Sequence, residues 1–135
     1  MPEYVTAQEN LQKFGQELSK EIEEMQVELN RKYDEFTRVQ EGLTDLVRQT
    51  RWEEIQRLGE RIEQFQQRAQ VDFQQEHDRL MQPIFEKANK AVEAVAKEQG
   101  ITYVISADPS ILLFKAVGTQ DLLPAVMQHL GIKND

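Results

Sequence analysis

Two histidines, a set of carboxylates and one tryptophan are the side chains of this sequence that could carry chemistry. His77 has no second His or Cys at ligand spacing, and the chain contains no Cys, so neither a metal site nor thiol catalysis is expected. His129 is expected beside the C-terminal end of a last helix. The Asp and Glu residues are spaced as exposed helix neighbours, with no Ser–His–Asp set and no buried acid pair. We therefore predict that the protein is not an enzyme and uses no metal or cofactor.

The sole tryptophan, Trp52, lies in a short apolar region. One interpretation is that its ring packs along its own helix pair. The other is that it joins its neighbours in an exposed patch that contacts a partner, as exposed apolar patches commonly do. On the second interpretation the predicted binding residues are Leu46, Val47, Trp52 and Ile55.

Composition favours a thin, solvated structure. Charged residues make up 30% and aromatic residues 7% of the 135 residues, which suits a two-helix coiled coil with little interior. The net charge of −8 argues against nucleic acid as a main partner, because duplex binding needs clustered positive charge. Between Tyr33 and Glu86 every basic residue is Arg. These arginines are interpreted as members of helix-spaced ion pairs, or alternatively as contacts to anionic head groups or acidic segments of a partner.

Apolar residues at heptad spacing predict two long helices that form a coiled coil. The first helix is expected from about Ala7 to Glu41, with a capping box at Thr6 and a length of about 50 Å at 1.5 Å per residue. Gly42 is expected to end it in the left-handed conformation, and Thr44 to cap the returning helix. The predicted seam residues are Leu18, Ile22, Met25, Leu29, Phe36, Leu58, Ile62 and Phe65.

The pattern changes after the second helix. Pro83 is expected to kink that helix at a shoulder, and Gly100 to stop it. Residues 101–105 and 111–114 are β-branched, aliphatic and aromatic, which predicts two strands, and Pro124 favours the first turn of a last helix that ends at Gly131. Because two strands on one short helix make a poor core, the same side chains are expected at a subunit interface. They are Ile101, Tyr103, Val104, Ile105, Leu112 and Phe114.

The predicted fold class is therefore mostly α: a long antiparallel helical hairpin on a small α/β oligomerisation body with a β-hairpin and a short C-terminal helix. We expect one unit over residues 1–135. Residues 6–82 are expected to form the coiled-coil arm, with its tip near 42–50, and residues 83–135 the body.

The sequence resembles the Skp/OmpH family of periplasmic chaperones for outer-membrane proteins. Residues 25–33 (MQVELNRKY) and 58–66 (LGERIEQFQ) resemble the two arm helices of that family. The more specific likeness lies in Pro83-Ile84, residues 100–105 (GITYVI), the strand Leu112–Phe114, Asp121-Leu122 and residues 130–132 (LGI). Coiled-coil likeness alone is weakly specific, so the resemblance depends mainly on this second set.

The resemblance implies a homotrimer whose helical arms enclose an unfolded outer-membrane protein in the periplasm, without ATP. No glycine-rich phosphate loop is present in the sequence, which agrees with the last point. Family members begin with a signal peptide and a first strand upstream of the segment that resembles Met1–Tyr4. We therefore expect this chain to be trimmed, and a strand missing from each subunit would leave open whether this chain trimerises. Family members are often basic, whereas this chain is acidic. Contact with lipopolysaccharide, which is attributed to the family, is therefore not expected for this chain.

Two rival hypotheses remain. An adaptor coiled coil would bind one folded partner through its tip and would show no preference for unfolded chains. A prefoldin-like cytoplasmic chaperone would place its strands between the two long helices, whereas here the predicted strands follow both. The sequence contains no apolar run near the roughly 20 residues of a membrane span, so no membrane span is expected.

Overall fold

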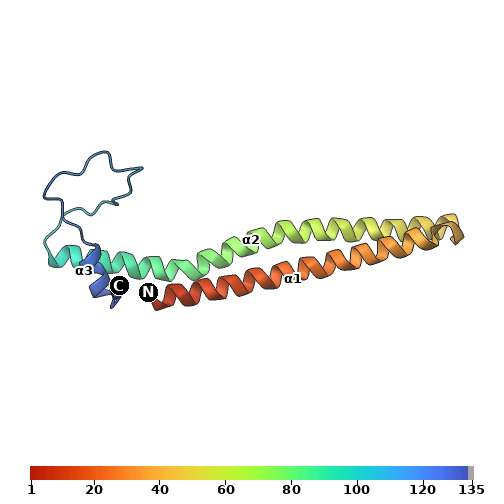
Figure 1. The fold of residues 1–135 in the computed structure, drawn as a ribbon, viewed down its shortest axis with the longest axis horizontal. Coiled ribbons are helices and arrows are strands. Elements are labelled where there is room, and N and C mark those ends of the chain that lie inside the picture. Colours follow the sequence, from red (N-terminus) through yellow and green to blue (C-terminus); the bar gives the residue numbers. More distant parts are fainter. Residues whose placement is uncertain (134–135) are drawn as a thin grey trace. The chain divides into compact units, whose positions relative to one another are not determined.

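A computed structural model describes residues 1–133 of the chain. In that part of the chain the element order is α1 (Pro2–Val39), a 3₁₀ turn (Gln40–Gly42), α2 (Asp45–Glu98) and α3 (Leu123–His129) (Figure 1). The chain divides into two compact units. One unit is residues 8–78, which we call the hairpin unit. The other, which we call the terminal unit, combines residues 1–7 with the chain from Arg79 onward.

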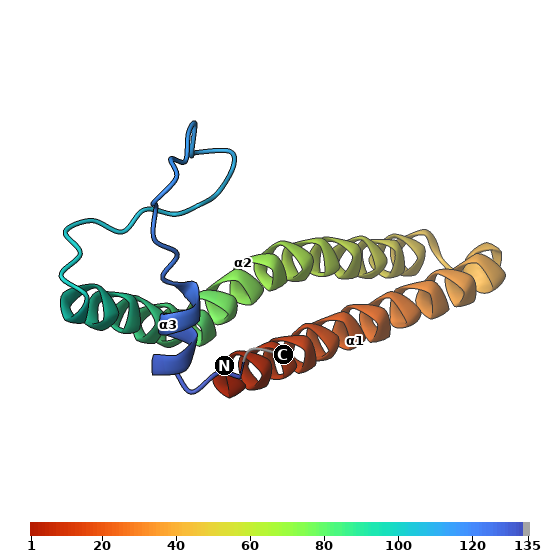
Figure 2. The same cartoon turned by 60° about the vertical axis from the view of Figure 1, so that its left-hand side comes forward.

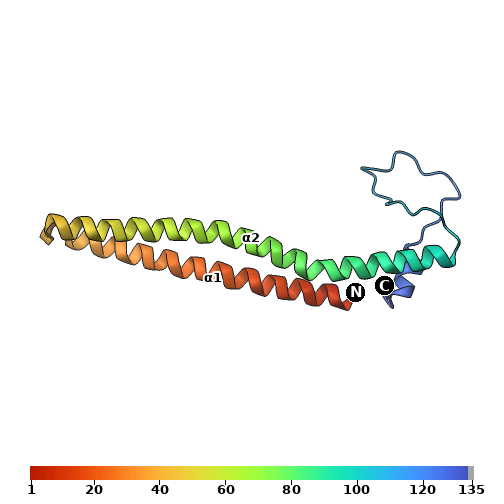
Figure 3. The ribbon, with the colours of Figure 1, turned by 180° about the vertical axis from the view of Figure 1, so that it is seen from behind.

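In the hairpin unit, α1 and α2 run antiparallel and side by side, as the opposite views of Figures 1 and 3 agree. Burial of one apolar stripe per helix stabilises this pair, because neither helix can cover its own stripe. The predicted seam residues on α1 are half-buried, except Phe36, which is buried. On the part of α2 that belongs to the hairpin unit, the predicted seam residue Phe65 is half-buried, and the buried apolar residues are Ile55, Leu58, Ile62 and Ala69. The helical hairpin expected from the heptad pattern is thus present.

Gly15 lies on the seam of α1 opposite an aromatic ring of α2. A Cβ at Gly15 would lie 3.1 Å from Cε2 of Phe73. The absence of a side chain at Gly15 therefore provides the space that the Phe73 ring occupies. Glycine lowers helix stability locally, but at this position it allows the Phe73 ring of the facing helix to pack against α1.

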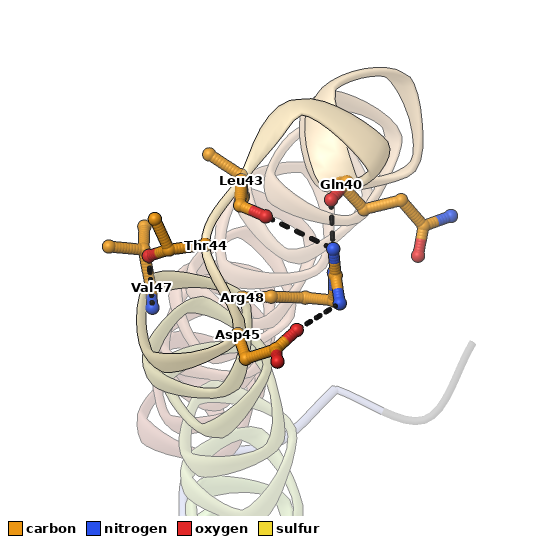
Figure 4. Close-up of polar contacts among 6 residues, drawn as sticks. All are labelled: Gln40, Leu43, Thr44, Asp45, Val47 and Arg48. Carbon is orange, nitrogen blue, oxygen red and sulfur yellow. Dashed lines mark hydrogen bonds and ion pairs between the residues drawn. The ribbon is translucent and has the colours of Figure 1, made fainter.

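The turn between α1 and α2 is organised by one arginine (Figure 4). The Arg48 guanidinium donates to the carbonyl oxygens of Gln40 and Leu43, each at 3.0 Å, and pairs with the Asp45 carboxylate at 3.0 Å. The Gln40 carbonyl, in the 3₁₀ turn after α1, also accepts the Leu43 N–H at 3.3 Å, so the guanidinium adds donors to carbonyls that the end of a helix leaves short of amide partners. Thr44 caps α2 as expected, since its hydroxyl oxygen accepts the Val47 N–H at 3.4 Å.

Two local expectations about helix ends were wrong. The φ angle of Gly42 is not positive, and the positive-φ glycines within residues 1–133 are Gly100, Gly118 and Gly131, because Arg48 supplies the donors that a left-handed glycine cap would otherwise provide. The hydroxyl of Thr6 donates to the Pro2 carbonyl inside α1, so Thr6 is not a cap and α1 begins earlier than predicted.

The terminal unit has its own small core. Ala91 and Val95 of α2 are buried against Leu122 and Val126, with Ile101 and Leu130 among the side chains that pack around them. Pro83 lies inside α2 and does not end it. Gly100, at φ +65°, ends α2 with a pair of bonds: the Ile101 N–H donates to Ala96 and the Gly100 N–H to Lys97. This is a Schellman motif, and the same pair of bonds follows α3 at Gly131.

The predicted β-hairpin is not present, and this part of the predicted fold class was wrong. Residues 101–118 contain no strand and form an irregular loop between α2 and α3 (Figure 2). Strand propensity reflects packing on a half-buried pleated surface more than a backbone preference. Within one chain, only the α2–α3 core is available to pack against these residues. A two-stranded hairpin without a covering layer is marginal in water, so the apolar content alone did not produce pairing.

Candidate functional site

The predicted binding residues near the turn do not share one environment. Leu46 is 75% exposed, and Val47 and Trp52 are each about 40% exposed. Ile55 is buried in the hairpin, at 8% exposure. The structure therefore leaves three of the four predicted side chains accessible to a partner, while Ile55 packs under them as part of the core.

Trp52 belongs to an aromatic cluster that joins the two helices. Its ring lies 5.7 Å, centroid to centroid, from Phe36 and 6.4 Å from Tyr33, at tilted angles that aromatic pairs favour. Phe36 is buried, whereas Tyr33 is half exposed. One part of the Trp52 ring thus packs within the helix pair and the remainder is exposed, and its contact with a partner stays a prediction.

Tyr33 was missed by the sequence analysis, although a pattern in the sequence includes it. Residues 32–36 read Lys-Tyr-Asp-Glu-Phe, and residues 51–55 read Arg-Trp-Glu-Glu-Ile. Each segment has a cation, an aromatic residue, two acids and an apolar residue in the same order. Since the two helices are antiparallel, the segments face each other with their apolar residues in the seam and their aromatic rings in contact.

A groove of about 180 Å³ crosses the hairpin at the same two segments. Its apolar lining is Phe36 and Ile55. The remaining lining residues are charged, from both helices: Arg31, Lys32, Glu35, Arg51 and Glu54. Arg31 pairs with Glu35 at 3.4 Å, whereas Lys32, Arg51 and Glu54 form no hydrogen bond or ion pair within residues 1–133.

The residues predicted at a subunit interface are largely exposed in the single chain. Tyr103, Ile105 and Phe114 are 84%, 72% and 80% exposed, and Val104 is also exposed. Ile101 and Leu112 are half-buried, and Ile101 packs against the α2–α3 core. Three further apolar residues of this segment, not singled out from the sequence, are also exposed: Ile111, Leu113 and Val117.

A second hollow lies within the terminal unit, on the face where α2 meets α3. Its volume is about 740 Å³, and its lining includes Pro83, Ala91, Ala94 and Leu130 with the polar side chains of Lys90 and His129. Ala91 is buried and Ala94 is half-buried. Together with the exposed loop, the hollow gives this unit a large uncovered surface.

The titratable groups with shifted pKa values are surface carboxylates held by local bonds. A hydrogen bond from Lys87 lowers the pKa of Glu3, and one from Lys97 lowers that of Glu93. Hydrogen bonds from Ser110 lower the pKa of Asp108 in the loop, and a bond to the His77 ring lowers that of Asp78. None of the polar or charged side chains in the described chain is buried. These interactions are local bonds at the surface of the chain.

Residues 1–133 hold no cluster of three His, Cys, Asp or Glu side chains placed to bind a metal ion. No helix in the described chain has the length and apolar content needed to cross a membrane. The arrangement instead offers apolar and aromatic surface on two helices and on a loop. Surfaces of this kind mark candidate interaction sites.

A family model described as outer membrane protein (OmpH-like) matches residues 1–130. The match spans both units. No curated protein matches the sequence.

Proposed function

The chain belongs to the outer membrane protein (OmpH-like) family, a family of periplasmic chaperones, and we propose that it is an ATP-independent holdase for unfolded outer-membrane β-barrel proteins in the periplasm. The observation that carries this proposal is the set of apolar side chains that the hairpin leaves exposed along its length. They are Val27, Tyr33, Val39, Leu46, Val47, Trp52, Val71 and Phe73.

Apart from the consecutive Leu46 and Val47 and the neighbouring rings of Tyr33 and Trp52, these side chains are separated along the chain by charged and polar residues. A surface of this kind suits many weak contacts with an extended amphipathic chain better than one tight interface, because no single apolar patch is large. We propose Leu46, Val47 and Trp52 as client contacts, with Ile55 supporting them from the core. The net charge of −8 would keep a loaded complex soluble.

The proposal includes assembly into a homotrimer through the terminal unit. It is supported by the exposed apolar residues between Ile101 and Val117, since a monomer gains nothing from leaving them in water. A second copy that covered Tyr103, Leu113 and Phe114 would remove the apolar surface that the single chain leaves open. In this assembly the hairpin units would act as arms around the client.

The test is aggregation of a urea-unfolded outer-membrane β-barrel protein on dilution, followed by light scattering without ATP. We expect this chain to suppress aggregation at a fixed stoichiometry, and folded β-barrel protein not to compete. A Leu46→Ser/Trp52→Ser variant should need more protein for the same suppression. Val5→Ser, which changes an exposed apolar residue of the terminal unit, is the matched control.

Two outcomes would contradict the proposal. In the first, the protein does not suppress client aggregation although sedimentation shows that it is assembled. This result would exclude the holdase function. Alternatively, folded proteins could compete as well as unfolded ones, which would favour an adaptor that binds a native partner through the turn region.

A further inference from the structure

Between Lys32 and Glu54 the hairpin has two unlike flanks. On one flank Tyr33 and Trp52 form an exposed aromatic pair. Lys32, Glu35, Arg51 and Glu54 precede or follow these rings by one or two positions, and they line the groove of about 180 Å³. Residues one or two positions apart in a helix lie about 100° or more apart around its axis. The rings and the groove therefore occupy different faces of the hairpin.

The groove has a small apolar base and a small excess of positive charge, because Phe36 and Ile55 each expose less than a tenth of their surface in it. Phe36 and Ile55 follow Lys32 and Arg51 by four residues, so each cation lies one helical turn from an apolar lining residue. Glu35 is already paired with Arg31. The unpaired groups are the two cations and the Glu54 carboxylate, which leaves one net positive charge available to an anion.

The size of the groove limits what can enter. Its volume corresponds to about six waters at roughly 30 Å³ each, well below the 300–1,000 Å³ of ordinary small-molecule pockets. One residue fits such a space, and a longer segment would extend out of it, because the groove is open to solvent. The part of a ligand that enters is therefore a single residue, and an anion with an apolar group on that residue would match the lining.

We propose that this groove binds the C-terminal residue of an unfolded client when that residue is apolar. A terminal residue carries a carboxylate and an apolar side chain on the same Cα, a combination that no internal residue offers. The carboxylate would lie between Lys32 and Arg51, and the side chain would pack on Phe36 and Ile55. This inference rests on the proposed function, which supplies a client with a free chain end.

The test uses the full chain and short blocked peptides, with Trp52 as the probe. Trp52 is the sole Trp and contacts Phe36, so filling the groove should change its fluorescence. The peptides are acetyl-Gly-Gly-Phe with a free carboxylate, the same peptide as an amide, and acetyl-Gly-Asp-Gly amide. We expect the free acid to bind about tenfold more tightly than its amide, as an added charge-assisted contact would give.

Variants assign this preference to named residues. Lys32→Gln and Arg51→Gln should each weaken binding of the free acid about threefold to fivefold, and Glu54→Gln should strengthen it by a similar factor, within the range of exposed ion pairs. Lys20→Gln and Arg68→Gln make the same changes of charge outside the groove and should have no effect. Circular dichroism would verify that each variant remains helical.

Equal binding of acid and amide, equal binding of the aspartate peptide, or displacement of the acid by inorganic phosphate at similar concentration would overturn the inference. The aggregation assay is run on the same variants. If the chain suppresses aggregation but the peptide preference is absent, only the groove assignment fails. If aggregation is not suppressed at all, the proposed function fails first.

Discussion

The hairpin unit and the loop of residues 101–117 carry the same kinds of apolar side chain, but they differ in how far these side chains are buried. In the hairpin, Leu58 and Ile62 are buried by the facing helix. In the loop, Leu113 and Val117 are fully exposed. The hairpin finds its covering surface within one chain, since the chain folds back along itself, whereas the loop has no such surface. The comparison separates residues that stabilise the subunit from residues available to a partner.

The largest expected effect lies in the hairpin core. Ile62→Ala should lower the free energy of unfolding by about 2–3 kcal/mol, because it removes buried methylene groups and leaves a cavity. Urea unfolding followed by circular dichroism measures this. Leu113→Ala, at a fully exposed position, is the control and should leave the unfolding of the dilute single chain unchanged. Similar losses for both variants would mean that the loop is packed in the monomer.

The next effect concerns assembly. Tyr103→Ser combined with Phe114→Ser should weaken self-association at least about tenfold, or about 1.4 kcal/mol, while the helical content of the chain stays the same. Sedimentation equilibrium across a concentration series gives the association constant. Val27→Ser, which changes an exposed apolar residue of the hairpin, should not alter it. An unchanged constant in the loop variant would place the interface elsewhere.

A smaller effect is expected at the turn. Arg48→Met keeps the aliphatic stem but loses the bonds to the carbonyls of Gln40 and Leu43, which should cost about 1 kcal/mol, since the site is partly solvated. Amide hydrogen exchange should rise first in residues 38–48. Arg38→Met changes an exposed arginine close to the turn and serves as the control. If exchange rises equally in both variants, the guanidinium bonds do not hold the turn.

The smallest effect is pH dependence in the terminal unit. The pKa of Glu3 is lowered by Lys87 from an ordinary value of 4.5, so the folded state favours the ionised carboxylate. This contribution is present above that value and is lost as pH falls through it toward the folded pKa. The difference in unfolding midpoint between the natural chain and Lys87→Met should therefore shrink as pH falls below 4.5 toward the lowered pKa of Glu3 in the folded state. A difference that stays constant with pH would exclude the ion pair as its cause.

Local patterns in the sequence predicted several helix ends because each depends on a few neighbouring residues. Gly100 and Gly131 end their helices with positive φ, and Thr44 caps α2. Gly42 was predicted by the same logic and failed, because Arg48 reaches back from the next helix and satisfies the carbonyls. A side chain that acts across a turn is not visible in a local pattern.

The candidate site shows the same division. From the sequence, one role was predicted for four neighbouring residues, Leu46, Val47, Trp52 and Ile55. The packing of the hairpin shows that Ile55 is buried while the other three are exposed. Tyr33 and the groove lining come from two helices, so they become a site only when segments 32–36 and 51–55 meet. The repeated order of residue types in those segments was present in the sequence, yet its meaning depends on the antiparallel register.

The sequence by itself determined that the chain forms two long antiparallel helices and a short last one, because heptad spacing and helix-ending glycines act over one or two turns. It did not determine the state of residues 101–117. Their composition is that of strands, but strand pairing requires a partner ladder and a covering layer, which are non-local. Only the tertiary structure decided that these residues remain an exposed loop in the single chain and which faces of the hairpin are accessible.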